Sequence, residues 1–130
     1  MILSMTTNLM VESVEETIEF YQEIFGFSTI TTVPNQAGHL DFAILNIGNL
    51  ILMLQERVNF VSEYPILVTN KTKASVSLYL TVDNFDELYA IVKKKLNILV
   101  DVHKTFYGTN EFAIVDNNGY VITIAEANSN

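Results

Sequence analysis

An internal repeat constrains the fold of this chain more than any other feature of its sequence. Four pairs of landmarks in the two halves are separated by the same 71 positions (82 − 11 for the first pair): Val11 and Val82, Ser13 and Asn84, Glu16 and Glu87, and Gly48 and Gly119. Repeated landmarks at one offset indicate a repeated supersecondary unit. The sequence therefore predicts two copies of one structural module.

Each copy has the pattern strand, helix, strand, strand, strand. Alternating apolar residues predict eight strands, over Thr6 to Val11, Ser28 to Val33, His39 to Ile47, Asn49 to Gln55, Ser77 to Val82, Leu99 to Val102, Glu111 to Val115 and Tyr120 to Ala125. Apolar stripes at helical spacing predict helices near 13–25 and 84–96. We expect these stripes to be Val14, Ile18, Tyr21 and Phe25 in one helix, and Phe85, Leu88, Val92 and Leu96 in the other.

Both helices carry signals at their ends. Ser13 and Asn84 are predicted N-caps, and each is followed three residues later by a glutamate, as in a capping box. Gly26 is a predicted left-handed residue at the end of the first helix. These features predict an α+β fold made of two βαβββ modules.

The chain has one expected domain over residues 1–130, with module one at 1–56, a linker at 57–74 and module two at 75–130. The segment from Arg57 to Lys73 contains Tyr64-Pro65 and a polar stretch, which are typical of a linker or lid loop. No apolar run reaches the roughly 18 residues that a membrane span requires. The first residues lack a basic region and a long apolar region, so no signal peptide is expected.

Composition excludes several classes of function. The chain has no cysteine, which rules out disulfides and thiolate chemistry. Its net charge of −8 disfavours binding to nucleic acid, and the only basic cluster is Lys93-Lys94-Lys95. We expect a cytoplasmic protein with no membrane partner.

Two motifs carry a resemblance to a known family. The stretch from Val11 to Tyr21, with Phe25-Gly26-Phe27 after it, resembles the opening signature of the vicinal oxygen chelate superfamily of glyoxalases, bleomycin-resistance proteins and dioxygenases. The stretch from Tyr107 to Phe112, with Asp116 to Tyr120 after it, resembles the closing signature, except that Asn117 stands where proline is common. The resemblance implies that the modules form curled mixed sheets around a cavity, with helices on the outer faces, and that the protein is a homodimer.

The resemblance also implies where metal ligands would lie. Relatives that use a divalent ion bind it through His and Glu side chains on the first and last strands of each module. The matching positions here are Thr6, Met53 (or Leu52, if the offset is followed strictly), Ser77 and Thr123. None of them is an imidazole or carboxylate ligand. His39 and His103 are expected at the surface, and Glu56 and Glu126 lie too far along their strands. We therefore expect no metal and no other cofactor.

Alternation also predicts which residues line the cavity. The expected helix-facing residues are Leu9, Val11, Leu78, Leu80, Ile122 and Ile124. The expected ligand-binding residues are Thr6, Asn8, Met53, Ser77, Tyr79, Thr81, Tyr107 and Thr123. No catalytic residue can be assigned from the sequence, although Asp41, Glu111, Tyr79 and Tyr107 are candidates for acid–base work.

These features favour a metal-independent small-molecule binding protein similar to the bleomycin-resistance branch. The expected ligand is a cationic or neutral aromatic compound, because the predicted lining has no Lys or Arg; Arg57, near the linker, is the one cation that could alter this. One alternative is a metal-free lyase or isomerase of the same fold. Another is a protein-interaction module whose cavity has collapsed.

Overall fold

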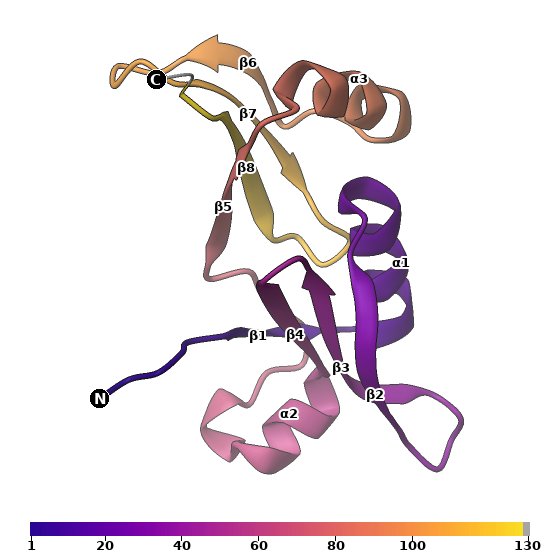
Figure 1. Cartoon of the computed structure of the whole chain (residues 1–130). Coiled ribbons are helices and arrows are strands. Elements are labelled where there is room, and N and C mark those ends of the chain that lie inside the picture. The colour runs from indigo at the N-terminus through magenta and orange to yellow at the C-terminus, as the bar shows by residue number, and fades with distance from the viewer. Residues whose placement is uncertain (129–130) are drawn as a thin grey trace. The chain divides into compact units, whose positions relative to one another are not determined.

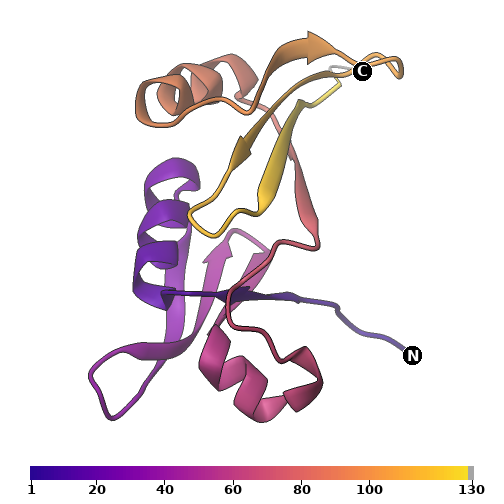
Figure 2. The same cartoon turned by 180° about the vertical axis from the view of Figure 1, so that it is seen from behind.

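A computed structural model describes residues 1–128 and divides the chain into two compact units, Met1–Thr72 and Lys73–Asn130. Each unit contains one four-stranded mixed sheet and one long helix (Figures 1 and 2). The predicted α+β class and the two similar modules are confirmed. None of the helices within residues 1–128 is long and apolar enough to cross a membrane.

The first unit has the element order β1 (Thr7–Val11), α1 (Val14–Phe25), β2 (Ser28–Pro34), β3 (Leu40–Ile47), β4 (Leu50–Glu56), α2 (Arg57–Glu63) and the 3₁₀ turn η1 (Pro65–Leu67). The strand order in its sheet is β1-β4-β3-β2. β1 pairs with β4 in parallel, and the other pairs are antiparallel. The helix α1 between β1 and β2 lets these two strands occupy opposite edges of the sheet.

The second unit repeats this arrangement. Its elements are β5 (Ser77–Val82), α3 (Phe85–Lys95), β6 (Val100–Lys104), β7 (Asn110–Val115) and β8 (Val121–Glu126). The strand order is β5-β8-β7-β6, with β5 parallel to β8. All eight predicted strands and both predicted long helices are therefore present, with ends that differ by at most two residues.

The helix-facing side of each sheet forms its core. In the first unit, Leu9, Val11, Ala43, Leu45 and Leu54 are almost fully buried. In the second unit, Ile122 and Ile124 are fully buried, whereas Leu78 and Leu80 are half-buried. Since side chains alternate along a strand, the residues between them project from the opposite side, which we call the inner face of each sheet.

The apolar stripe of α1 differs in part from the expectation. Val14 and Tyr21 are buried as predicted, but the other fully buried positions are Thr17 and Ile24, and Ile18 and Phe25 are only half-buried. Thr17 tolerates burial because its Oγ1 donates to the carbonyl oxygen of Ser13 at 2.7 Å. The stripe of α3 is buried at Phe85, Leu88 and Val92.

The two predicted N-caps behave differently. The Ser13 Oγ accepts from the Glu16 backbone N–H at 3.2 Å, and Gly26 ends α1 with a φ of 81°. Asn84 occupies the N-cap position of α3, but its side chain makes no capping hydrogen bond. The capping function of Asn84 was therefore predicted wrongly.

This difference predicts unequal effects of matched substitutions. Ser13→Ala should lower the free energy of unfolding by about 1 kcal/mol, because the Glu16 N–H loses its acceptor. Asn84→Ala serves as the control and should change it by no more than a few tenths of a kcal/mol. Urea denaturation of both variants measures this, and equal losses would contradict the assignment.

The segment predicted as a linker or lid loop contains α2 and η1. Its N-cap is Glu56, the last residue of β4, whose carboxylate accepts from the backbone N–H groups of Val58 and Asn59 at 2.8 and 3.0 Å. Glu56 thus ends a strand and begins a helix, which fixes the position of α2 next to β4.

Strand register settles which residue of β4 corresponds to Thr123. Asn8 pairs with Met53, and Tyr79 pairs with Thr123. Asn8 and Tyr79 are 71 positions apart (79 − 8), whereas Met53 and Thr123 are 70 apart (123 − 53). Met53, rather than Leu52, therefore occupies the equivalent position, and Leu52 lies on the helix-facing side with an exposed fraction of 6%.

Candidate functional site

The inner face of the second unit carries a carboxylate and an aromatic ring in neighbouring rows. Residues that pair across β5, β8 and β7 form rows on this face. One row is Tyr79 on β5, Thr123 on β8 and Ala113 on β7, and the next row is Thr81, Ala125 and Glu111 on the same strands. Tyr79 and Glu111 are therefore separated diagonally by one strand. Ala125 between them is small, which leaves room for the long tyrosine side chain to cross β8.

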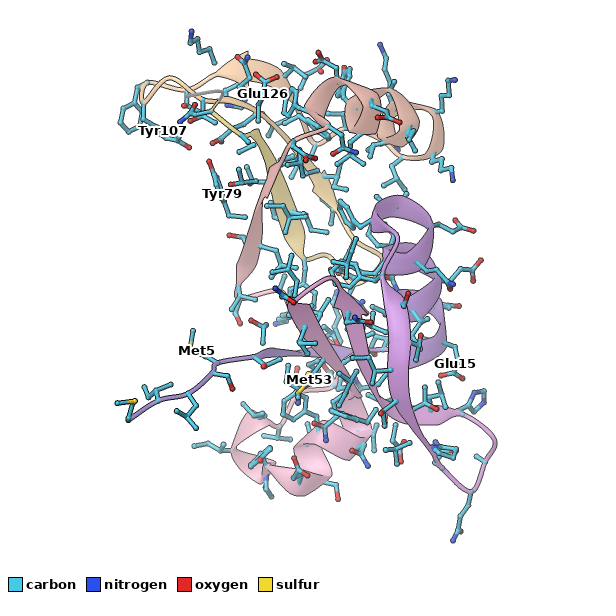
Figure 3. The ribbon with its side chains drawn as sticks, viewed as in Figure 1. Met5, Glu15, Met53, Tyr79, Tyr107 and Glu126 are labelled. Atoms are coloured by element: carbon cyan, nitrogen blue, oxygen red, sulfur yellow. The ribbon has the colours of Figure 1, made fainter. Side chains whose placement is uncertain are left out.

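Two tyrosine hydroxyls meet at the Glu111 carboxylate. Tyr79 Oη donates to Glu111 Oε2 at 2.5 Å, and Tyr107 Oη donates to the same oxygen at 2.7 Å. Tyr107 comes from the connection between β6 and β7, and Figure 3 shows Tyr79 and Tyr107 on the same side of this unit. We call Tyr79, Tyr107 and Glu111 the Tyr–Glu–Tyr cluster.

Glu111 is buried although it carries a carboxylate, with an exposed fraction of 5%. No Lys, Arg or His in residues 1–128 forms an ion pair with it. Its second oxygen, Oε1, accepts no hydrogen bond from any described residue. The carboxylate therefore has two neutral donors, no cationic partner and one oxygen that can accept another donor.

The hydrogen bond to Glu111, together with burial and the hydroxyl of Tyr107, raises the pKa of Tyr79 well above its usual range. Tyr79 is thus a hydrogen-bond donor at neutral pH. Tyr79 and Tyr107 are 54% and 55% exposed. The cluster therefore combines an anionic acceptor with two accessible aromatic rings, a combination that suits a cation.

The predicted ligand-binding residues divide between the two units. Thr6, Asn8 and Met53 belong to the first unit, and Ser77, Tyr79, Thr81, Tyr107 and Thr123 to the second. The structure brings Tyr79 and Tyr107 together through Glu111. Glu111 itself was predicted only as a possible base, although its place on a strand beside Ala113 and Val115 was a signal that it shares their face. That all these residues line one cavity stays a prediction.

The positions that correspond to metal ligands hold no ligand set. Within residues 1–128, no three His, Asp or Glu side chains are grouped so that they could hold a metal ion. His39 is exposed and its Nδ1 lies 3.1 Å from Glu15, and His103 is exposed with its Nδ1 2.9 Å from the carbonyl oxygen of Asp101. Glu126 accepts from the Asn110 amide at 3.0 Å.

Arg57 is already paired within the first unit. Its Nε lies 2.9 and 3.0 Å from the two oxygens of Glu12, and one terminal nitrogen donates to the carbonyl oxygen of Thr69 at 3.1 Å. Thr72 Oγ1 also donates to Glu12. Burial favours the neutral form of Glu12, but the hydrogen bonds from Thr72 and Arg57 outweigh it and lower the pKa of Glu12.

A pocket of about 330 Å³ in the first unit is lined by carboxylates that already bind other residues of the same unit. The lining residues are Glu12, Ser13, Glu15, Asn35, His39, Leu40 and Glu56. Glu12 pairs with Arg57, Glu56 caps α2, and Glu15 accepts from the Leu40 backbone N–H at 3.1 Å. Hydrogen bonds from His39 and Leu40 outweigh the effect of burial and lower the pKa of Glu15. These contacts assign the carboxylates a structural role.

Comparisons with known proteins agree with this architecture. The profile of the Glyoxalase/Bleomycin resistance protein/Dioxygenase superfamily matches residues 3–124. A search among curated proteins gave no match.

Solved structures share the fold at low sequence identity. A glyoxalase-related enzyme from Fulvimarina pelagi is 18% identical, with a TM-score of 0.77 and coverage of 97% of this chain and 89% of that one. The hypothetical protein SA1046 from S. aureus is 21% identical, with a TM-score of 0.75 and coverage of 98% and 95%. TioX from Micromonospora sp. ML1 is 17% identical, with a TM-score of 0.72 and coverage of 94% and 96%.

Proposed function

The chain belongs to the Glyoxalase/Bleomycin resistance protein/Dioxygenase superfamily, and we propose that it binds a small cationic or neutral aromatic compound without a metal ion. The Tyr–Glu–Tyr cluster supplies the binding site. A cationic group lies against Glu111, and the rings of Tyr79 and Tyr107 contact the aromatic part of the ligand.

The observation that carries this proposal is the unpaired carboxylate of Glu111. Burial has removed part of the hydration of this carboxylate, which is unfavourable, and two neutral donors rather than a cation replace what is lost. A bound cation offsets this cost through Oε1. The two tyrosine rings add cation–π attraction of about 0.5–2 kcal/mol each.

The charge distribution supports the same ligand class. The chain carries a net charge of −8, which favours the approach of cations. Arg57, the cation that could have favoured an anionic ligand, is held by Glu12 and Thr69. An anionic ligand would thus meet Glu111 without a compensating positive charge.

A second candidate function is a metal-free lyase or isomerase. The free oxygen of Glu111 can accept a proton from a bound substrate, and the two neighbouring hydroxyls can donate hydrogen bonds. A Glu111→Gln variant that binds a substrate normally but no longer converts it would favour this role over simple binding.

The binding proposal is tested with aromatic probes of opposite charge. Benzyltrimethylammonium should bind at least about tenfold more tightly than phenylacetate, a difference of about 1.4 kcal/mol. Glu111→Gln should weaken binding of the cation about tenfold, because it removes the charge and retains the shape of the side chain. Calorimetry at two salt concentrations measures both effects.

Glu87→Gln is the matched control, since Glu87 is an exposed residue of α3 and its substitution removes the same charge. It should change the affinity less than twofold. Tighter binding of phenylacetate, or equal losses in the two variants, would show that long-range charge rather than the cluster determines binding.

A further inference from the structure

Three side-chain amides in the first unit form a continuous chain of hydrogen bonds. The Asn8 amide donates to Gln55 Oε1 at 2.9 Å, and the Gln55 amide donates to Asn59 Oδ1 at 2.8 Å. The Asn59 amide then donates to Asp41 Oδ2 at 3.3 Å. Asn8, Gln55 and Asn59, which we call the amide relay, come from β1, β4 and α2.

Asp41 sets the direction of the relay. An ionised carboxylate only accepts hydrogen bonds, whereas an amide has one donor end and one acceptor end. Asn59 must therefore turn its nitrogen towards Asp41 and its oxygen towards Gln55. Gln55 must then turn its nitrogen towards the Asn59 oxygen, and Asn8 must turn its nitrogen towards the Gln55 oxygen. The Asn8 nitrogen is therefore occupied by Gln55, and only the Asn8 oxygen is left without a partner inside the relay.

A second contact fixes Asp41 itself. The Asn35 amide donates to Asp41 Oδ1 at 3.1 Å, and Asn35 Oδ1 accepts from the backbone N–H groups of Ala37 and His39. Asn35 therefore cannot exchange its two ends without losing both of those bonds. Each oxygen of Asp41 thus faces an amide donor.

The relay ends at an acceptor without a donor. Asn8 Oδ1 is buried and has no hydrogen-bond partner among the described residues. An unpartnered buried acceptor is unfavourable, and it cannot be relieved by turning the amide while Asp41 remains ionised. The fold therefore holds one polar atom ready for a donor from outside the chain.

The surroundings of Asn8 on the inner face are apolar. Asn8 shares its row with Met53 and Ile44, and in the next row Met10 and Phe42 lie on either side of its relay partner Gln55. The four apolar residues are all half-buried. Met53 is labelled beside the sheet in Figure 3. Methionine side chains have three rotatable bonds and adapt easily to an incoming group, so an apolar ligand can reach the amide by displacing them.

We propose that the amide relay, oriented by Asp41, makes the inner face of the first unit a binding site for apolar compounds that carry an O–H or N–H donor. Asn8 Oδ1 accepts from the ligand, and Asp41 is a positioning residue that determines the specificity for donors over acceptors. This site shares no residue with the Tyr–Glu–Tyr cluster, so either proposal can fail without the other.

The test uses two neutral probes that differ in one donor. Benzyl alcohol has an O–H group, and benzyl methyl ether has only an acceptor oxygen. NMR titration should show that the alcohol binds about tenfold more tightly, in keeping with one added hydrogen bond, and that it shifts the side-chain amide signals of Asn8. Because neither probe is charged, Glu111 does not affect the comparison.

Asp41→Asn should abolish the preference for the alcohol. Asn35 still donates to one atom of the new side chain, which must be its oxygen, so the new amide nitrogen faces Asn59. The relay then reverses and Asn8 presents its N–H₂ group, which binds either probe. The expected affinity ratio falls from about ten to about one.

Asn59→Ala interrupts the relay and leaves the charge of Asp41 in place. It should also lower the affinity ratio, which separates the effect of orientation from that of charge. Asp86→Asn removes an equal charge from an exposed residue of α3 and should leave the ratio unchanged. Equal affinities of the two probes for the unmodified protein, or an unchanged ratio in Asp41→Asn with intact backbone spectra, would overturn the proposal.

Discussion

Phe112→Ala should lower the free energy of unfolding by about 3–5 kcal/mol, the range for truncating a fully buried aromatic side chain. Phe112 has an exposed fraction of 0%, and its ring contacts the rings of Phe85 and Tyr89 with centroid distances of 5.4 and 5.1 Å. Its removal leaves a cavity between β7 and α3 and also ends two edge-on aromatic contacts. Chemical denaturation followed by circular dichroism measures the loss.

Phe106→Ala is the matched control within the same unit. Phe106 is fully exposed, and its ring contacts that of the neighbouring Tyr107. Its truncation should change stability by no more than about 0.5 kcal/mol. A similar loss in both variants would mean that the burial of Phe112 is not maintained in solution.

Leu54→Ala should have an effect of similar size in the first unit, about 2–5 kcal/mol. Leu54 is fully buried at the centre of its sheet, where it pairs with Leu9 on one side and Ala43 on the other. Since neither of these neighbours is large and flexible, the cavity cannot readily be filled. Thermal and urea denaturation should agree on the loss.

Leu50→Ala tests the same chemical change on the same strand. Leu50 begins β4 and is 63% exposed. Its truncation should leave the midpoint of denaturation close to that of the unmodified protein. If Leu50→Ala proved as destabilising as Leu54→Ala, the exposed position of Leu50 would be wrong, because the two residues lie on the same side of β4 and are distinguished by their burial.

The strands and the long helices could be predicted because their signals are local. Alternation identified β5 over its exact range, and the Ser13 cap identified the start of α1. The helix α2 was not predicted because its N-cap is Glu56, which also completes the alternating pattern of β4. Glutamate is not among the preferred N-cap residues, so the sequence contained no recognisable start signal.

The candidate sites were less predictable, because their contacts join distant residues. Tyr79 and Glu111 are 32 positions apart, and Asn8 and Gln55 are 47 apart. Alternation indicates which face a side chain occupies, but not which strands lie next to each other. Gln55, Asn59 and Asn35 were missed for this reason, although Gln55 and Met53 share the same face by simple alternation.

The repeat has diverged in chemistry while retaining its geometry. Asn8 and Tyr79 are equivalent in register, as are Met53 and Thr123. One unit presents neutral amides ordered by a carboxylate at their end, and the other presents a carboxylate held by two phenols. Under the two proposals above, equivalent positions favour different ligand groups, a hydrogen-bond donor in one unit and a cation in the other.

The order of strands in each sheet also affects how the chain can fold during synthesis. Within residues 1–128, β5 pairs only with β8, whose first residue follows the start of β5 by 44 positions (121 − 77). At a translation rate of about 5–20 residues per second, β5 leaves the ribosome roughly 2–9 seconds before β8 does. During that interval a nascent chain exposes an unpaired strand, which is a site for aggregation or for chaperone binding. A chain stalled before Val121 would therefore be expected to recruit chaperones until β8 is completed.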